Sequence, residues 1–154
     1  MDSENFSTMQ THKVVEEKYW ALQFTSMQKG DEKPIDTTQY KAVIDSGTSL
    51  LVGPQALVNP LIQGIAVMGD CSNIDTLPTI NLKIDQTDYP ITSRDYVLME
   101  TSAGQSQCTM GIAAMPMPVG FNYFILGDVF MRKYPSYFNL NDNTVGFQVA
   151  KSLY

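Results

Sequence analysis

Apolar and polar residues alternate in several segments of the chain, and this period of two is typical of β-strands that bury one face in a core. The alternation predicts strands over residues 20–27, 77–84 and 145–149. Short runs of apolar residues predict two further strands, over residues 40–44 and 50–52. A chain that consists mainly of such strands is expected to fold as an all-β domain.

Proline, glycine and small polar residues separate these strands and predict the connections between them. Residues 28–34 are expected to form a hairpin-like connection, and residues 88–90 are expected to form the turn after the strand over 77–84. The stretch 110–120 is apolar but rich in Pro and Gly. We therefore expect it to be a loop with an apolar face rather than regular structure.

Two short helices are expected within this all-β pattern. Pro54 suits the first turn of a helix, but Pro60 is expected to break or restart that helix. The second helix is expected over residues 127–133, directly after a buried strand. Because the sequence contains no repeat, low-complexity segment or linker, we expect one domain.

The composition agrees with one globular domain and limits its partners. The 154 residues are 44% hydrophobic and only 17% charged, a balance that favours short strands and turns. The net charge of −6 and the isoelectric point near 4.5 argue against nucleic acid or an anionic membrane as a partner, because both are bound through basic patches.

The N-terminal residues 1–6 are polar, and the sequence contains no apolar run of the roughly eighteen residues that a membrane helix needs. We therefore expect neither a targeting segment nor a membrane span in this chain. If the protein is secreted or vesicular, its signal is expected upstream of Met1, which fits a fragment better than a complete gene product. Asn5-Phe6-Ser7 is a glycosylation sequon that only a secretory protein would use.

Cysteine and histidine are too few for the Ser-His and Cys-His hydrolase mechanisms. Cys71 and Cys108 can form one disulfide or remain two free thiols, and a bridge would contribute about 3–4 kcal/mol in the chain-entropy model. His12 is the single histidine, and we expect it to be a solvent-exposed bystander. Serine- and cysteine-hydrolase mechanisms therefore lack a base, and no residue cluster has the spacing of a metal site.

The strongest candidate for chemistry is Asp45, which ends the apolar strand 40–44 and begins the sequence Asp45-Ser46-Gly47-Thr48-Ser49. Gly47 allows backbone N–H groups to approach the carboxylate, and neighbouring hydroxyls can donate hydrogen bonds to its oxygens. Such a loop holds one acid in one orientation. A second apolar run that ends in an acid follows later, as Phe124-Ile125-Leu126-Gly127-Asp128.

These segments, together with Tyr19-Trp20 upstream, occur in an order and spacing that point to one family. The chain resembles the C-terminal lobe of a pepsin-like aspartic endopeptidase of the cathepsin D or plasmepsin type, from Asp2-Ser3 to Val145-Gly146-Phe147. The resemblance implies that residues 1–154 form one lobe, a bulged half-barrel of strands with short helices, and that the N-terminal lobe is absent. It also implies a Cys71–Cys108 disulfide and no cofactor or metal.

The resemblance further implies roles for the residues around Asp45. Asp45 matches the second catalytic aspartate, and Ser46, where the family more often has Thr, matches the hydroxyl that locks the active-site loops of two lobes together. Thr48 resembles the residue that donates a hydrogen bond to the outer oxygen of Asp45 and keeps it ionised. The other matches are to residues that contact substrate: Gly47, Ser49, Tyr19, Phe124, Ile125 and Met117 in the loop 115–118.

Peptide hydrolysis in this family needs a water molecule between two aspartates, one to accept its proton and one to polarise the scissile carbonyl. Asp45 is the one aspartate here that precedes Ser/Thr-Gly, so the chain is expected to be inactive without the N-terminal lobe of the same protease. The expected partners are that lobe and a peptide or protein substrate. The expected location is the secretory pathway, a lysosome or vacuole, or the extracellular space.

Two other hypotheses remain open at this point. Two copies of the chain could pair as retroviral proteases do and contribute Asp45 twice, although the chain is larger than such a subunit and shows no flap of its own. Alternatively, the lobe binds peptides or partners and catalyses nothing.

Overall fold

The computed structural model describes residues 6–15, 20–116, 118, 120 and 122–150. Strands predominate, which confirms the all-β prediction, and helical segments are short. The strands are β1 (Phe6–Lys13), β2 (Ala21–Lys29), β3 (Ile35–Asp36), β4 (Lys41–Ile44), β5 (Leu51–Pro54), β6 (Ile80–Ile84), β7 (Thr87–Ile91), β8 (Val97–Ser102), β9 (Gln105–Met110), β10 (Ile112–Met115), β11 (Tyr123–Leu126), β12 (Ser136–Asn139) and β13 (Thr144–Ala150). The helical segments are α1 (Gln55–Ile62), η2 (Ile74–Thr76), α2 (Ser93–Tyr96) and α3 (Asp128–Met131).

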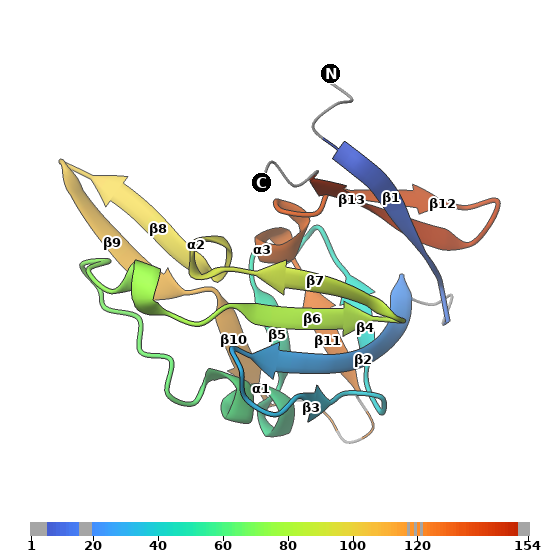
Figure 1. Ribbon diagram of the computed structural model, residues 1–154, viewed down its shortest axis with the longest axis horizontal. Coiled ribbons are helices and arrows are strands. Elements are labelled where there is room, and N and C mark those ends of the chain that lie inside the picture. The colour runs from blue at the N-terminus through green and yellow to red at the C-terminus, as the bar shows by residue number, and fades with distance from the viewer. Residues whose placement is uncertain (1–5, 16–19, 117, 119, 121, 151–154) are drawn as a thin grey trace.

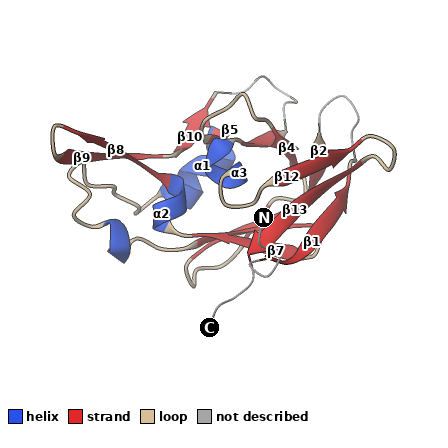
Figure 2. Cartoon of the chain, turned by 90° about the horizontal axis from the view of Figure 1, so that it is seen from above, coloured by secondary structure: helices blue, strands red, loops and turns tan. Residues whose placement is uncertain are grey.

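The strands form a large sheet, a small sheet and a separate hairpin (Figure 1). The large sheet has the strand order β10-β5-β11-β4-β2-β6-β7, and β3 pairs with β2 beside this path. The small sheet has the order β1-β13-β12 and is antiparallel. Strands β8 and β9 pair only with each other within the described residues and project from the body of the molecule (Figure 2). Helices α2 and α3 lie near each other, whereas α1 packs against β10 and β5, away from them (Figure 1).

The core lies against the large sheet, where alternate residues of the strands are buried. In β6 the buried residues are Ile80, Leu82 and Ile84, and in β2 they include Leu22 and Phe24. This alternation confirms the strands predicted from the period of two, with β6 beginning at Ile80. Each fully buried side chain of this size contributes about 1.5–3 kcal/mol relative to its exposed state.

An aromatic cluster joins the small sheet to the edge of the large sheet. Tyr89 of β7, Phe130 of α3, Tyr134 and Phe147 of β13 are all buried. Tyr89 and Phe130 contact each other and both of the other rings, with ring centroids 5.0 to 5.7 Å apart. Most of these pairs are edge-to-face, the arrangement that the quadrupoles of aromatic rings favour. The cluster explains why the predicted helix at 127–133 and the C-terminal strand both pack into one core.

The turn predicted at residues 88–90 is wrong. Ile84, the last residue of β6, pairs with Thr87, the first residue of β7, so the turn consists of Asp85 and Gln86. The residues 88–90 belong to β7, where Tyr89 is buried and Pro90 is exposed. Pro90 is tolerated because β7 is an edge strand, in which a residue without an N–H group costs no ladder hydrogen bond on the free side.

Two other expectations about proline-rich segments are also corrected. Helix α1 continues through Pro60 to Ile62, since Leu61 is fully buried and the N–H of Gln63 donates to the carbonyl of Asn59 at 3.0 Å. Within the stretch 110–120, the residues of β10 form a regular strand that pairs in parallel with β5. The prediction of a loop fails there because β5 supplies the partner that local sequence does not show.

Candidate active site

The candidate catalytic residue Asp45 follows β4 directly and lies in the loop that leads to β5. Strand β11 passes between these two strands, parallel to β4 and antiparallel to β5. The N–H of Asp45 donates to the carbonyl of Leu126, the last residue of β11, at 3.1 Å. The second apolar run therefore passes directly beside the Asp45 loop.

The loop holds both carboxylate oxygens of Asp45. The N–H of Gly47 donates to Oδ1 at 2.9 Å, and the Thr48 hydroxyl donates to Oδ2 at 2.9 Å. The N–H of Thr48 also donates to the backbone carbonyl of Asp45 at 3.3 Å, which closes the turn. Hydrogen bonds to an ionised acceptor are stronger than neutral ones, so this pattern restrains the side chain to one orientation.

The surroundings leave this carboxylate accessible. Asp45 is partly exposed, as is Thr48, whereas Ser46, Gly47 and Ser49 are exposed. The three buried residues Ala42, Val43 and Ile44 anchor the preceding strand in the core. A rigid strand therefore presents an oriented acid at the surface, which is the arrangement that a general acid or base needs.

Gly127 makes the close contact between the Asp45 loop and the chain after β11 possible. Its N–H donates to the carbonyl of Leu50 at 3.1 Å, and the next two N–H groups, of Asp128 and Val129, donate to the carbonyls of Thr48 and Ser49 at 2.8 and 3.2 Å. A Cβ atom on Gly127 would lie 2.8 Å from the carbonyl carbon of Thr48 and closer still to two carbonyl oxygens. Only glycine at position 127 therefore leaves room for the backbone of the Asp45 loop.

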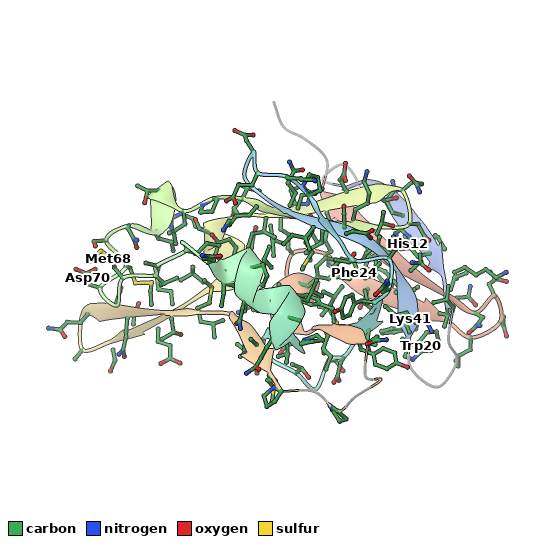
Figure 3. The ribbon with its side chains drawn as sticks, turned by 90° about the horizontal axis from the view of Figure 1, so that it is seen from below. His12, Trp20, Phe24, Lys41, Met68 and Asp70 are labelled. Atoms are coloured by element: carbon green, nitrogen blue, oxygen red, sulfur yellow. A yellow bond between two sulfur atoms is a disulfide. The ribbon has the colours of Figure 1, made fainter. Side chains whose placement is uncertain are left out.

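The residues predicted to contact substrate divide into three groups. Ile125 is partly exposed on β11, and Gly47 and Ser49 are exposed on the Asp45 loop. Phe124 is fully buried and packs against Phe24, which is labelled in Figure 3; the two ring centroids lie 5.4 Å apart. A Cβ atom on Gly53 would lie 2.5 Å from the ring of Phe124. Phe124 is therefore a core residue and not a pocket wall. Tyr19 and Met117 lie outside the described residues.

Gly53 is a site-supporting residue that the sequence analysis did not single out. It lies in β5 opposite Ala114 of β10, and the space that its missing side chain leaves is filled by Phe124 and Val58. A glycine inside an apolar strand is the available signal, because such a residue often marks a close approach of another chain segment.

The predicted disulfide is present. Cys71 and Cys108 are bonded, with a Cα–Cα distance of 5.2 Å, and Cys108 is buried. The N–H of Cys108 donates to the carbonyl of Gly69 at 2.9 Å, so the bridge and this hydrogen bond together fasten the loop after α1 to β9.

His12 is not the exposed bystander that the sequence suggested. Its side chain is buried, with a relative exposure of 3%, and faces Asp85 and Tyr89. Both partners are distant in sequence, so no local pattern could reveal this burial.

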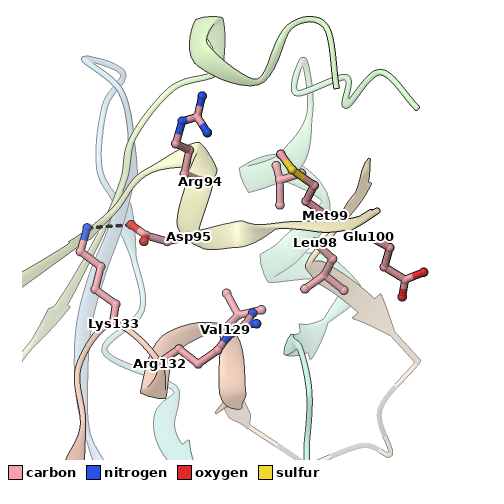
Figure 4. A pocket seen from close by; sticks show the side chains of 9 residues that line it. Arg94, Asp95, Leu98, Met99, Glu100, Val129, Arg132 and Lys133 are labelled. Carbon is pink, nitrogen blue, oxygen red and sulfur yellow. Dashed lines mark hydrogen bonds and ion pairs between the residues drawn. The ribbon is translucent and has the colours of Figure 1, made fainter. Parts of the chain in front are cut away.

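A cavity of about 560 Å³ lies away from Asp45, among α2, β8 and α3 (Figure 4). Of the cations that line it, Arg94 forms an ion pair with Asp75 at 2.9 Å and Lys133 forms one with Asp95 at 2.6 Å. No residue of the 45–49 loop lines it, so this cavity does not contribute to the candidate site.

The sequence of this chain is similar to known proteins over almost its whole length. A family model described as eukaryotic aspartyl protease matches residues 1–150. The chain belongs to this family. Cathepsin D of Chionodraco hamatus is 37% identical over 149 residues, and cathepsin D of Clupea harengus is 37% identical over 150 residues; each alignment covers 90% of this chain and 37% of the relative. Human cathepsin D is 33% identical over 150 residues, which are 91% of this chain and 36% of that protein.

The membership agrees with the structure, an all-β pepsin-like lobe. The chain spans little more than a third of the length of these aspartyl protease relatives, 37% or 36% of each. In the part of the chain that the structure describes, no helix has the length and hydropathy needed to cross a membrane.

Proposed function

We propose that this chain is the C-terminal lobe of a two-lobe aspartic endopeptidase and that it supplies Asp45 as one of two catalytic aspartates. The observation that carries the proposal is the restraint of both Asp45 oxygens, by the Gly47 N–H and the Thr48 hydroxyl, on a loop that remains open to solvent. A structural aspartate that only caps its own turn needs no such access. The short coverage of full-length relatives supports the same proposal.

In the proposed mechanism, Asp45 shares a water molecule with an aspartate of the N-terminal lobe. One carboxylate accepts a proton from the water while the other, protonated, donates a hydrogen bond to the scissile carbonyl oxygen. The hydrogen bonds from Gly47 and Thr48 hold Asp45 in the orientation that this step needs, so little reorganisation is required. A single carboxylate cannot serve both roles, and the chain alone is expected to be inactive.

The exposed residues of the loop have proposed roles beside Asp45. Ser46 is exposed on this loop, and its hydroxyl is proposed to join the loop to the facing loop of the N-terminal lobe. Gly47 and Ser49 are exposed on the same loop and are proposed to contact the backbone of a peptide substrate, and Ile125 contributes an apolar surface on the neighbouring strand.

The proposed location is the secretory pathway, with a lysosome, a vacuole or the extracellular space as destination. The Cys71–Cys108 disulfide supports this proposal, because structural disulfides persist in oxidising compartments and are rare in the cytosol.

The catalytic role of Asp45 is tested by Asp45→Asn in the chain assembled with its N-terminal lobe. This change preserves size and removes the charge, and we expect cleavage of unfolded protein at acidic pH to be abolished while the variant stays folded. Asp36→Asn is the matched control, because Asp36, exposed at the end of β3, also accepts hydrogen bonds from an N–H and a hydroxyl, both of Thr38. Equal activity of Asp45→Asn and Asp36→Asn would refute the proposal.

A further inference from the structure

Strand β1 carries a buried polar side chain that pairing with β13 does not explain. His12 is 3% exposed and points from β1 toward the edge of the large sheet (Figure 3). Its Nδ1 lies 2.8 Å from Oδ2 of Asp85, and its Nε2 is hydrogen-bonded to the hydroxyl of Tyr89. Both ring nitrogens therefore have partners, as burial of a polar ring requires.

The chemistry of the two partners determines where the ring proton lies. A carboxylate only accepts hydrogen bonds, so Nδ1 of His12 carries the proton and donates it to Asp85. Burial, with the neighbouring Tyr134 and Asp85, raises the pKa of Tyr89, so its hydroxyl stays protonated and can donate to Nε2 of a neutral His12 ring. In the neutral ring the order of donation is thus Tyr89 to His12 to Asp85.

Asp85 occupies a backbone position that favours glycine. It is the first residue of the two-residue β6–β7 turn and has φ of +53°, a conformation that costs energy for most residues with a side chain. Its backbone is held on both sides, by its N–H to the carbonyl of Gln23 at 3.0 Å and by the Thr25 hydroxyl to its own carbonyl at 2.7 Å. The turn therefore fixes the position from which the Asp85 carboxylate reaches His12.

We propose that Tyr89, His12 and Asp85 form a clasp that holds strand β1 against the edge of the large sheet. Strand β1 is an edge strand of the small sheet, and β7 is an edge strand of the large sheet. The clasp links these two edges by directed hydrogen bonds, whereas the aromatic contacts nearby, such as His12 to Phe147 at 5.7 Å, position β13 as well. This inference does not rest on the catalytic role of Asp45.

The clasp and an ordinary turn predict opposite effects of Asp85→Gly on amide hydrogen exchange in β1. Replacing a non-glycine residue at positive φ by glycine relieves backbone strain. If Asp85 is only a turn residue, Asp85→Gly should therefore slow amide hydrogen exchange in β1 or leave it unchanged. If the clasp exists, Asp85→Gly should accelerate amide hydrogen exchange in β1 by about tenfold, because the buried His12 loses a charged acceptor. Ala103→Gly is the matched control.

The control is close in geometry. Ala103 is also the first residue of a two-residue hairpin turn, with φ of +52°, and it is exposed. We expect Ala103→Gly to leave exchange in β1 unchanged, and amides of the β8–β9 hairpin to be unaffected by Asp85→Gly. Slower or equal exchange in β1 of the Asp85→Gly chain would overturn the proposal.

A second comparison keeps the test independent of strain in the turn. His12→Phe retains an aromatic ring and removes both hydrogen bonds, so in that background Asp85→Gly should no longer accelerate exchange in β1. An undiminished tenfold effect in the His12→Phe background would show that Asp85 acts through other contacts and would refute the clasp. In the unsubstituted chain, a ring nitrogen spectrum should show the proton on Nδ1, and a proton on Nε2 alone would contradict the proposed order of donation.

Discussion

Gly127→Ala tests whether the Asp45 loop depends on the close crossing of the chain after β11. A methyl group at this position would meet the backbone carbonyls of Thr48 and Leu50, which cannot rotate away as a side chain can. The backbone dihedral angles of Gly127, φ −92° and ψ −152°, lie in the extended region, so the expected penalty is steric rather than conformational.

The size of the effect follows from the hydrogen bonds that must separate. Three N–H groups, of Gly127, Asp128 and Val129, donate to carbonyls of the loop segment 48–50. At about 1 kcal/mol for each net hydrogen bond, their loss lowers the free energy of unfolding by about 3 kcal/mol, which is the upper part of the range for overpacking. For a domain of this size the melting temperature should fall by about 6–12 °C.

Urea denaturation and thermal melting measure the effect, and Gly69→Ala is the control. Gly69 has open space where a Cβ atom would lie and no positive φ, so its substitution should change the free energy of unfolding by less than about 0.5 kcal/mol. If Gly127→Ala behaves like Gly69→Ala, the loop does not rest on this crossing, and the account of how Asp45 is positioned is wrong.

Three further substitutions probe the bridge, the loop and an exposed acid. Replacing Cys71 and Cys108 together by Ser should lower the free energy of unfolding by about 4 kcal/mol, measured by urea denaturation, and a loss below about 1 kcal/mol would contradict this. Thr48→Val should lower kcat of the assembled enzyme by about tenfold or more, whereas Thr48→Ser should retain activity; equal loss in both variants would exclude the hydroxyl as the cause. Hydrogen bonds from the N–H and then the hydroxyl of Thr38 lower the pKa of Asp36, so its stabilising contribution is present above about pH 4 and is lost as the pH falls through the folded-state pKa. The melting temperatures of the unsubstituted chain and Asp36→Ala should therefore differ near pH 6 and converge in strong acid, and a gap that stays constant would refute this.

Local sequence predicted those parts of the fold in which neighbouring residues carry the signal. The strands β2, β6 and β13 alternate with a period of two, and the Asp45 loop combines an apolar strand with a glycine and hydroxyls, so both could be read directly. The roles proposed for the loop residues and the expected disulfide pairing come from the family resemblance, and the structure adds the disulfide itself and the hydrogen bonds that hold Asp45.

The errors arise where a distant segment decides the structure. Asp85 and Gln86 are a weak turn signal, and the Pro90 signal was stronger, but pairing with β6 draws Pro90 into an edge strand. Strand β10 depends on β5, far upstream, and Phe124 is buried because Gly53 leaves room for its ring. His12 is buried because Asp85 and Tyr89 supply partners that no local pattern contains.

The most direct test of the account compares cleavage of an unfolded protein at acidic pH by the chain alone and by the chain with its N-terminal lobe. In the proposed mechanism Asp45 supplies one carboxylate and the reaction needs two, so we predict no turnover by the chain alone and pepstatin-sensitive cleavage by the two lobes together. Turnover by the 154-residue chain alone that disappears in Asp45→Asn would contradict the account and would favour a homodimer that contributes Asp45 twice.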